Sequence, residues 1–334
     1  MAGTHAHPAS LTGPEGTREG LRAIRLAGVA LALSAGIRLT VAAISGSVGL
    51  LAVGLDDLGD VLSTVALSVA FIASRRAADR RYTFGYQRFE DLSGVLVVAT
   101  IWASVAFATF EAIRKMNGHH EVGRIGIAMA AAGLGLVANG FAGLYKIRVG
   151  RRISSEPLVA DGKHAIADGL ASVVALGGLI AVKAGAVMAD PIAAIVIVLA
   201  LVWVGIDATK AVSARLLDAV DPTIVGHIEH IATHTPGVDG IGRVQARWAG
   251  RSLYVTLTVA TAGDRSLSDA HTTSEAVAHR IIHEVPGVAQ VDVHVDPWEA
   301  HGGAAHESTA AHATGDGTHP APVPARTDEH EHRH

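Results

Sequence analysis

The sequence contains no cysteine, and it has few aromatic or charged residues. Among 334 residues, 4% are Phe, Trp or Tyr and 17% are charged, whereas 49% are hydrophobic. The absence of Cys excludes disulfides and thiolate metal sites, which leaves imidazole and carboxylate groups as the strong metal ligands. The formal net charge of −4 is too small to indicate a nucleic-acid partner. This composition is typical of a membrane protein with a polar part attached.

Six stretches of the chain are long and apolar enough to cross a bilayer, which takes about 20 residues. They cover approximately residues 23–45, 48–73, 91–113, 122–145, 158–182 and 190–208. The sequence therefore predicts an α-helical membrane protein with six transmembrane helices within residues 21–208. Residues 1–20 have no apolar core, so we expect a disordered tail there and no signal peptide.

The distribution of basic residues predicts the orientation of these spans. Basic clusters precede the first span and follow the second and fourth, and the opposite loops hold fewer basic residues. By the positive-inside rule, both termini of a multi-pass protein in the plasma membrane are expected to be cytoplasmic. Lys146 is counted with the basic cluster after the fourth span, and Arg38, inside the first span, is expected to snorkel to the far headgroups.

The pattern changes after the sixth span, where residues 209–298 read as helix, strand, strand, helix, strand. Pro222 opens the first helix, alternating runs follow at about 239–247 and 252–260, and a helix at about 268–284 precedes the last strand. This αββαβ order predicts a small cytoplasmic α+β domain, ferredoxin-like in arrangement, which is marginal alone and is expected to dimerise. Residues 299–334 are rich in Gly, Ala, Thr, Pro and His and predict a disordered tail, with its seven His residues either simply solvated or capturing metal weakly.

One short pattern occurs twice, each time at the start of an apolar span. Ser47 leads to Asp56 and Asp60, and Ser155 leads to His164 and Asp168 with the same spacing. Residues four apart lie on one face of a helix, about 6 Å from each other along the axis. Ionisable groups at this depth cost about 2.5 to 3.5 kcal/mol each on insertion, so they are candidates for function. Together they would offer three carboxylates and one imidazole to a tetrahedral divalent ion, and a structural ion pair between helices is the alternative.

Further motifs extend this pattern over most of the chain. They are Gly46-Ser47-Val48, the segment from Tyr82 to Glu90, Asp161-Gly-Lys-His164, Asp190-Pro191, Ala270-His271, His294-Val-Asp296-Pro and the two Pro-Gly-Val sequences. Through them, residues 20–298 resemble the cation diffusion facilitator family, proton-coupled exporters of divalent transition metals. The resemblance implies a transporter without enzymatic activity or cofactor, in which Asp56, Asp60, His164 and Asp168 bind the transported ion.

The resemblance also implies a homodimer that binds metal between its cytoplasmic domains. His271, His294 and Asp296 match that site, but Gly242 and a Thr, either Thr256 or Thr258, stand where further His would be expected. The site is therefore expected to be depleted, and the alternative is that these are ordinary surface residues.

Two more positions follow from the resemblance. In the loop after the second span, Asp79 matches an additional metal site of some members, but Tyr82 and Tyr86 stand where its His ligands would be. We expect that site to be absent or very weak. Arg88 and Asp218 are expected to form a charge pair that ties the cytoplasmic domain to the membrane part.

The expected function is export of a divalent cation from the cytoplasm in exchange for protons. Zn²⁺ is the first choice, with Cd²⁺, Co²⁺, Fe²⁺ or Mn²⁺ as others, and His164 is the expected proton-coupling residue because an imidazole has a reference pKa near 6.5. An intramembrane metallohydrolase is an alternative, but it would need a His-Glu-x-x-His motif, and Ala165 follows His164. A metal-responsive regulator, or a proton-coupled transporter of a non-metal solute in which these groups relay protons, is the other.

Overall fold

The computed structural model describes residues 14–45, 48–116, 125–186, 188–298 and 323–324. The chain forms two compact units that divide after Leu216. Residues 1–13 of the predicted N-terminal tail lie outside the described residues, as do all but two residues of the predicted His-rich tail.

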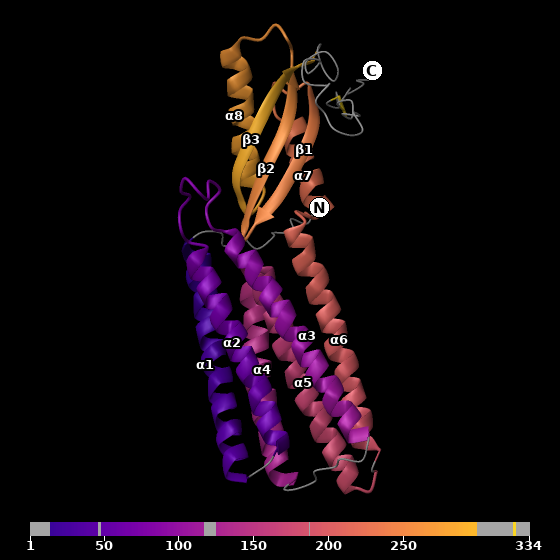
Figure 1. Ribbon diagram of the computed structural model, residues 1–334. Helices are drawn as coiled ribbons and strands as arrows, with labels where there is room; N and C mark the ends of the chain where they lie inside the picture. Colours follow the sequence, from indigo (N-terminus) through magenta and orange to yellow (C-terminus); the bar gives the residue numbers. More distant parts are fainter. Residues whose placement is uncertain (1–13, 46–47, 117–124, 187, 299–322, 325–334) are drawn as a thin grey trace, which may run out of the picture. The chain divides into compact units, whose positions relative to one another are not determined.

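The first unit consists of six long helices that run side by side (Figure 1). They are α1 Pro14–Ser45, α2 Val48–Ala73, α3 Arg88–Met116, α4 Ile125–Arg152, α5 Glu156–Lys183 and α6 Ala189–Leu216. Among the described residues, Glu15–Val41, Arg88–Arg114 and Ile192–Leu216 are by length and composition apolar enough to cross a membrane. Large apolar side chains lie exposed along these helices, among them Leu33, Phe110, Leu144, Leu199 and Trp203. Because a bilayer tolerates such exposure and water does not, this surface fits a lipid environment.

The ends of the helical region differ from the sequence prediction at two places. Helix α1 begins at Pro14, so the prediction of a tail reaching residue 20 is wrong for residues 14–20. Proline is favoured in the first turn of a helix, Thr17 is buried, and Glu19 forms an ion pair with Arg152 at 2.9 Å. Helix α6 continues to Leu216, so residues 209–216 extend the last long helix and are not part of the cytoplasmic domain as predicted.

Glycines let α4 and α5 approach each other backbone to backbone. A Cβ atom on Gly143 would lie 2.7 Å from the carbonyl oxygen of Gly162, and one on Gly150 would lie 3.0 Å from the amide nitrogen of Val159. Small residues at a helix interface permit this close packing in membranes. The contact fixes the part of α5 that carries His164.

The second unit is a sheet covered by two helices. Its elements are α7 Pro222–Thr233, β1 Gly240–Ala249, β2 Ser252–Thr261, α8 Leu267–Glu284, β3 Val288–Pro297 and the short β4 Val323–Pro324. The strand order is β3-β2-β1-β4, in which β2 pairs with β1 antiparallel and with β3 in parallel. The predicted αββαβ order is confirmed (Figure 1). The prediction of a wholly disordered tail is wrong at Val323, which pairs with Ile241 of β1.

One face of this sheet forms the core of the second unit. Alternate residues of β2, such as Leu253, Val255 and Leu257, are buried with Ile228 of α7 and Ile281 of α8. The period-2 alternation of β2 therefore sends one set of side chains to the helices and the other set, with Tyr254, Thr256 and Thr258, to the opposite face.

Both helices of this unit have side-chain caps at their first turns. The carboxylate of Asp221 accepts a hydrogen bond from the amide of Thr223 at 2.8 Å, and the Ser266 hydroxyl accepts one from the amide of Asp269 at 3.1 Å. The donors from Thr223 hold the pKa of the Asp221 carboxyl below its ordinary value. These caps satisfy amides that no carbonyl inside the helix can reach.

Candidate metal centre in the helical unit

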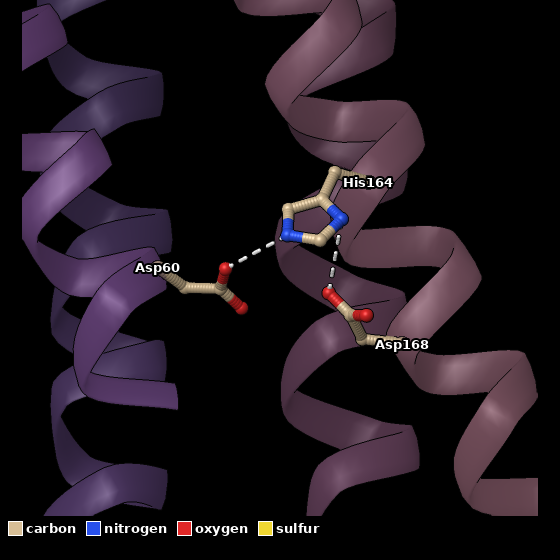
Figure 2. A group of neighbouring side chains, drawn as sticks. All are labelled: Asp60, His164 and Asp168. Atoms are coloured by element: carbon tan, nitrogen blue, oxygen red, sulfur yellow. Dashed lines mark ion pairs between the residues drawn. The ribbon is translucent and has the colours of Figure 1, made fainter. Parts of the chain in front are cut away.

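Three of the side chains singled out in the sequence meet between α2 and α5 (Figure 2). The Nε2 atom of His164 lies 3.2 Å from Asp60 Oδ1, and its Nδ1 atom lies 3.6 Å from Asp168 Oδ2. One potential ligand atom of each residue lies within 4.8 Å of the others. The side chain of His164 is only 1% exposed. The structure thus assembles one imidazole and two carboxylates at a buried point.

The local structure of both helices explains how these groups are presented. His164 and Asp168 are one turn apart in α5, whereas Asp60 comes from α2. In α2, the hydroxyls of Ser63 and Thr64 donate to the carbonyl oxygen of Asp60 at 2.9 and 2.8 Å. These bonds tie down the turn from which the Asp60 carboxylate projects.

The donor atoms of this cluster have the spacing of ligands around a small cation. Ligand atoms about 2.0 to 2.1 Å from a tetrahedral Zn²⁺ lie roughly 3.3 Å from one another. The 3.2 and 3.6 Å contacts of His164 are close to that value. Within the described residues, both ring nitrogens of His164 and Oδ2 of Asp168 are buried without a well-formed hydrogen bond. Buried polar atoms of this kind normally have a partner, and a divalent cation would supply one.

Asp56, the fourth predicted ligand, is not part of this cluster. Its Oδ1 atom accepts a hydrogen bond from the hydroxyl of Ser104 in α3 at 3.0 Å. Asp56 lies one turn before Asp60 on α2, so a change of side-chain rotamer and the loss of this bond would be needed to turn it toward His164. Its role as a ligand stays a prediction.

Arg38 does not snorkel to the headgroups, and that prediction is wrong. Its guanidinium is 3% exposed and forms an ion pair with Asp57 of α2 at 3.0 Å, to which Ser34 also donates at 3.5 Å. Gly135 of α4 makes room for the guanidinium, since a Cβ atom there would overlap Arg38 Nη2. A basic residue in the first span and an acidic one in the second were a signal for this pair, which the sequence analysis missed.

Lys146 is also buried and does not belong to a basic surface cluster as predicted. Its Nζ atom lies 2.6 Å from Asp161 of α5 and donates to the hydroxyl of Thr64 in α2 at 3.1 Å. The hydroxyl of Ser63 donates to Asp161 at 3.1 Å. Asp161 precedes His164 by three residues. This network therefore joins α2, α4 and α5 beside the cluster, a role for Asp161 that sequence reasoning missed beyond noting its place in a motif.

Asp79 organises the loop between α2 and α3. Its carboxylate accepts hydrogen bonds from the amides of Tyr82 and Arg81 and from the hydroxyl of Tyr86, each at 2.7 Å. The amide of Tyr82, the Tyr86 hydroxyl and the amide of Arg81 hold the pKa of the Asp79 carboxyl below its ordinary value. This carboxylate stays ionised as pH falls to about its unperturbed value, and its bonds are lost only below that. The geometry gives Asp79 a structural role in this loop.

The residues predicted for the cytoplasmic metal site lie on two elements. On β3, His294 Nε2 is 2.9 Å from Asp296 Oδ1, and His271 is on α8. Within the described part of the chain, these three do not form a group with metal-binding spacing. Thr258 pairs with His294 in the β2–β3 register, and a Cβ on Gly242 would lie 3.2 Å from the Thr258 Cβ. Thr258, and not Thr256, is therefore the threonine that lies in one row with Gly242 and His294.

The proposed charge pair joins residues of the two different units. Arg88 begins α3, and Asp218 follows α6 with a left-handed backbone, at a φ of 59°. Their pairing stays a prediction.

A bundle of long apolar helices around buried carboxylates and an imidazole, followed by a small α+β unit, defines a multi-pass membrane protein that handles cations. Family profiles sharpen this assignment, because the cation efflux transmembrane domain matches residues 24–217 and the cation efflux protein cytoplasmic domain matches residues 220–298. The chain belongs to the cation efflux family, also called the cation diffusion facilitators. It is a transporter of divalent metals and not an enzyme, and the predicted family is confirmed.

Similar proteins come from bacteria and plants. A probable cation efflux system protein of Mycobacterium tuberculosis is 36% identical over 285 residues, which cover 85% of this chain and 86% of that protein. The magnetosome protein MamB of Magnetospirillum gryphiswaldense is 28% identical over 258 residues, covering 77% and 86%. Metal tolerance protein 2 of Oryza sativa is 29% identical over 298 residues, covering 79% and 76%.

Proposed function

We propose that this protein exports Zn²⁺, or a similar ion such as Cd²⁺, Co²⁺, Fe²⁺ or Mn²⁺, from the cytoplasm across the plasma membrane in exchange for protons. The observation that carries the proposal is the buried cluster of Asp60, His164 and Asp168 between two membrane helices. A site that mixes imidazole with carboxylate and lacks thiolate suits borderline divalent ions. It also binds less permanently than a thiolate site, which favours release.

Proton exchange supplies the driving force for this export. Moving a divalent cation outward against about 100 mV costs roughly 4.6 kcal/mol, and each entering proton returns about 2.3 kcal/mol. Metal binding requires the neutral ring of His164 and ionised carboxylates, so protons compete with the metal for the same lone pairs. We assign the coupling proton to His164, which lies between both carboxylates of the cluster.

The His164→Asp variant tests this assignment of the proton. A carboxylate has a reference pKa near 3.9, so the variant loses the group that titrates near neutral pH. We expect its metal affinity to depend less steeply on pH between about 6 and 8, and its preference to shift toward Mn²⁺, because an all-oxygen site favours harder ions. Metal binding titrated at several pH values measures both effects. A variant with the pH dependence of the unmodified protein would place the coupling proton on another group.

We further propose a homodimer with both termini in the cytoplasm. The match of residues 220–298 to a cytoplasmic domain of cation efflux proteins supports this orientation. It agrees with the positive charges at the ends of α2 and α4. His271, His294 and Asp296 would bind metal only weakly in this dimer, since Gly242 and Thr258 supply no strong ligand.

We also propose that Arg88 and Asp218 form the charge pair between the two units. If so, Arg88→Asp and Asp218→Arg should each reduce transport, and the two together should restore it, because the pair is re-formed with reversed polarity. Metal flux in vesicles at equal protein content measures the rescue. A double variant no better than the weaker single one would exclude the pair.

The proposal as a whole is tested by metal uptake into proteoliposomes with an imposed pH gradient, across a panel of Zn²⁺, Cd²⁺, Co²⁺, Fe²⁺ and Mn²⁺. We expect the gradient to drive uptake of Zn²⁺ above that of empty vesicles. Absence of metal uptake for every ion of the panel would contradict the proposal.

A further inference from the structure

Both helices of the cytoplasmic unit end in the same pattern, two histidines four residues apart followed by Pro-Gly-Val. His230 and His234 occupy the end of α7, and His279 and His283 occupy the end of α8. All four side chains are exposed. They are separate from the cluster in the membrane helices and from the predicted cytoplasmic site at His271, His294 and Asp296.

The two imidazoles of α7 are close enough to hold one ion. Their ring centroids are 4.1 Å apart, with an angle of 40° between the planes. Residues four apart lie on the same face of a helix, about one turn from each other, which suits two-point binding.

A hydrogen bond prepares one of these rings for metal binding. The Nδ1 atom of His234 lies 2.8 Å from the carbonyl oxygen of His230. A carbonyl only accepts, so this nitrogen carries the proton, and in the neutral ring Nε2 keeps a free lone pair. Metal-binding histidines in proteins commonly have their second nitrogen fixed to a carbonyl or carboxylate in this way.

The electrostatic surroundings of the pair include both signs of charge. It lies at the C-terminus of α7, where the helix dipole favours a cation. Arg280 of α8 opposes a cation, because its guanidinium donates to the carbonyl oxygen of His234 at 2.8 Å. Glu284 offsets that charge through its 3.1 Å ion pair with Arg280. The histidine rings themselves remain exposed to solvent.

We propose that His230 and His234 bind a divalent transition-metal ion through two imidazole nitrogens, with water completing the coordination. The ligands select borderline ions that favour imidazole, namely Zn²⁺, Cu²⁺, Ni²⁺ and Co²⁺, over Mg²⁺ or Ca²⁺. The pair on α8, with ring centroids 4.3 Å apart, repeats the arrangement. This is a binding site on the surface of the cytoplasmic unit that exchanges metal with the surrounding solution, and it does not depend on the transport mechanism.

The test uses Cu²⁺ as the probe and the full-length protein in detergent. Competing sites are silenced by Asp60→Ala, His294→Ala and His279→Ala, and by changing the seven histidines of the tail to Asn. We expect one tightly held Cu²⁺ per protomer, with an electron paramagnetic resonance spectrum that shows two coordinated imidazole nitrogens. His234→Ala should weaken binding by about 10²-fold, since the second contact of a linked pair is intramolecular, and should leave a single-nitrogen spectrum.

Two matched variants distinguish paired binding from general affinity of a histidine-containing helix. Combining Glu229→His with His230→Ala keeps the number of imidazoles on α7 but places the introduced imidazole about 140° around the helix from that of His234. We expect this double variant to bind as weakly as His234→Ala. His227→Ala should bind like its parent, and circular dichroism should show α7 intact in all variants.

Parent-like affinity in the variant that combines Glu229→His with His230→Ala, or a loss in His227→Ala equal to that in His234→Ala, would overturn the proposal. So would a spectrum without two nitrogens in the parent protein. Because every measurement is made on protein lacking Asp60, either result leaves the transport proposal untouched.

Discussion

Replacing Asp60 or His164 with alanine is expected to lower metal flux to the level of empty vesicles while the protein stays folded in the membrane. Both side chains point at a common centre where His164 Nε2 and Asp60 Oδ1 are 3.2 Å apart, and they contribute little apolar packing. Loss of either one leaves too few ligands to replace the hydration shell of a divalent ion at membrane depth. Flux of Zn²⁺ into proteoliposomes, at matched protein content and helical circular dichroism, measures the effect.

Asp207→Ala is the matched control for this experiment. Asp207 is a carboxylate on α6 that pairs with Lys163 of α5, with side chains 43% and 35% exposed. It lies outside the three-residue cluster, so the same change of residue type should keep most of the flux. Normal flux in Asp60→Ala or His164→Ala would show that the ion is carried elsewhere.

Breaking the buried pair of Arg38 and Asp57 is expected to destabilise the helical unit by about 3 to 5 kcal/mol, because each single change leaves an uncompensated charge away from water. The two side chains are 3% and 5% exposed, so solvent screens them little. Arg38→Met combined with Asp57→Ala removes both charges and should recover most of the loss. Unfolding of the four proteins in detergent gives the coupling energy as a double-mutant cycle.

The Lys163 and Asp207 pair is again the comparison for this cycle, since it joins neighbouring helices but is partly exposed. Its coupling should be about 0 to 1 kcal/mol, as is usual for accessible ion pairs. If the cycle for Arg38 and Asp57 gives a coupling no larger than this, the pair does not hold α1 to α2.

Sequence reasoning could predict the cluster because its signal is local. Spacing of four residues places His164 and Asp168 on one face of α5, and the apolar surroundings make every ionisable residue conspicuous. The position of Asp56 could not be predicted in this way. Its carboxylate is bonded to Ser104 of another helix, and nothing in the spacing along α2 reveals that competing partner.

The buried charges show the same limit. Arg38 and Lys146 were each interpreted as surface groups, because a single span gives the depth of a residue but not its partner. Their partners, Asp57 and Asp161, lie on neighbouring helices. The αββαβ order of the second unit was predictable from alternation and Pro-Gly-Val turns, whereas the end of α6 was not, since polar residues such as Lys210 interrupt the apolar pattern while the helix continues.

The central claim is that one set of side chains, centred on His164, carries both the metal and the coupled protons. It is tested most directly by recording internal pH and internal Zn²⁺ together in the same proteoliposomes, for the unmodified protein and for Asp60→Ala. We predict that inward Zn²⁺ flux is accompanied by outward proton movement in a fixed ratio, and that both signals disappear together in Asp60→Ala. Zn²⁺ flux without proton movement, or either signal persisting in Asp60→Ala, would contradict the account.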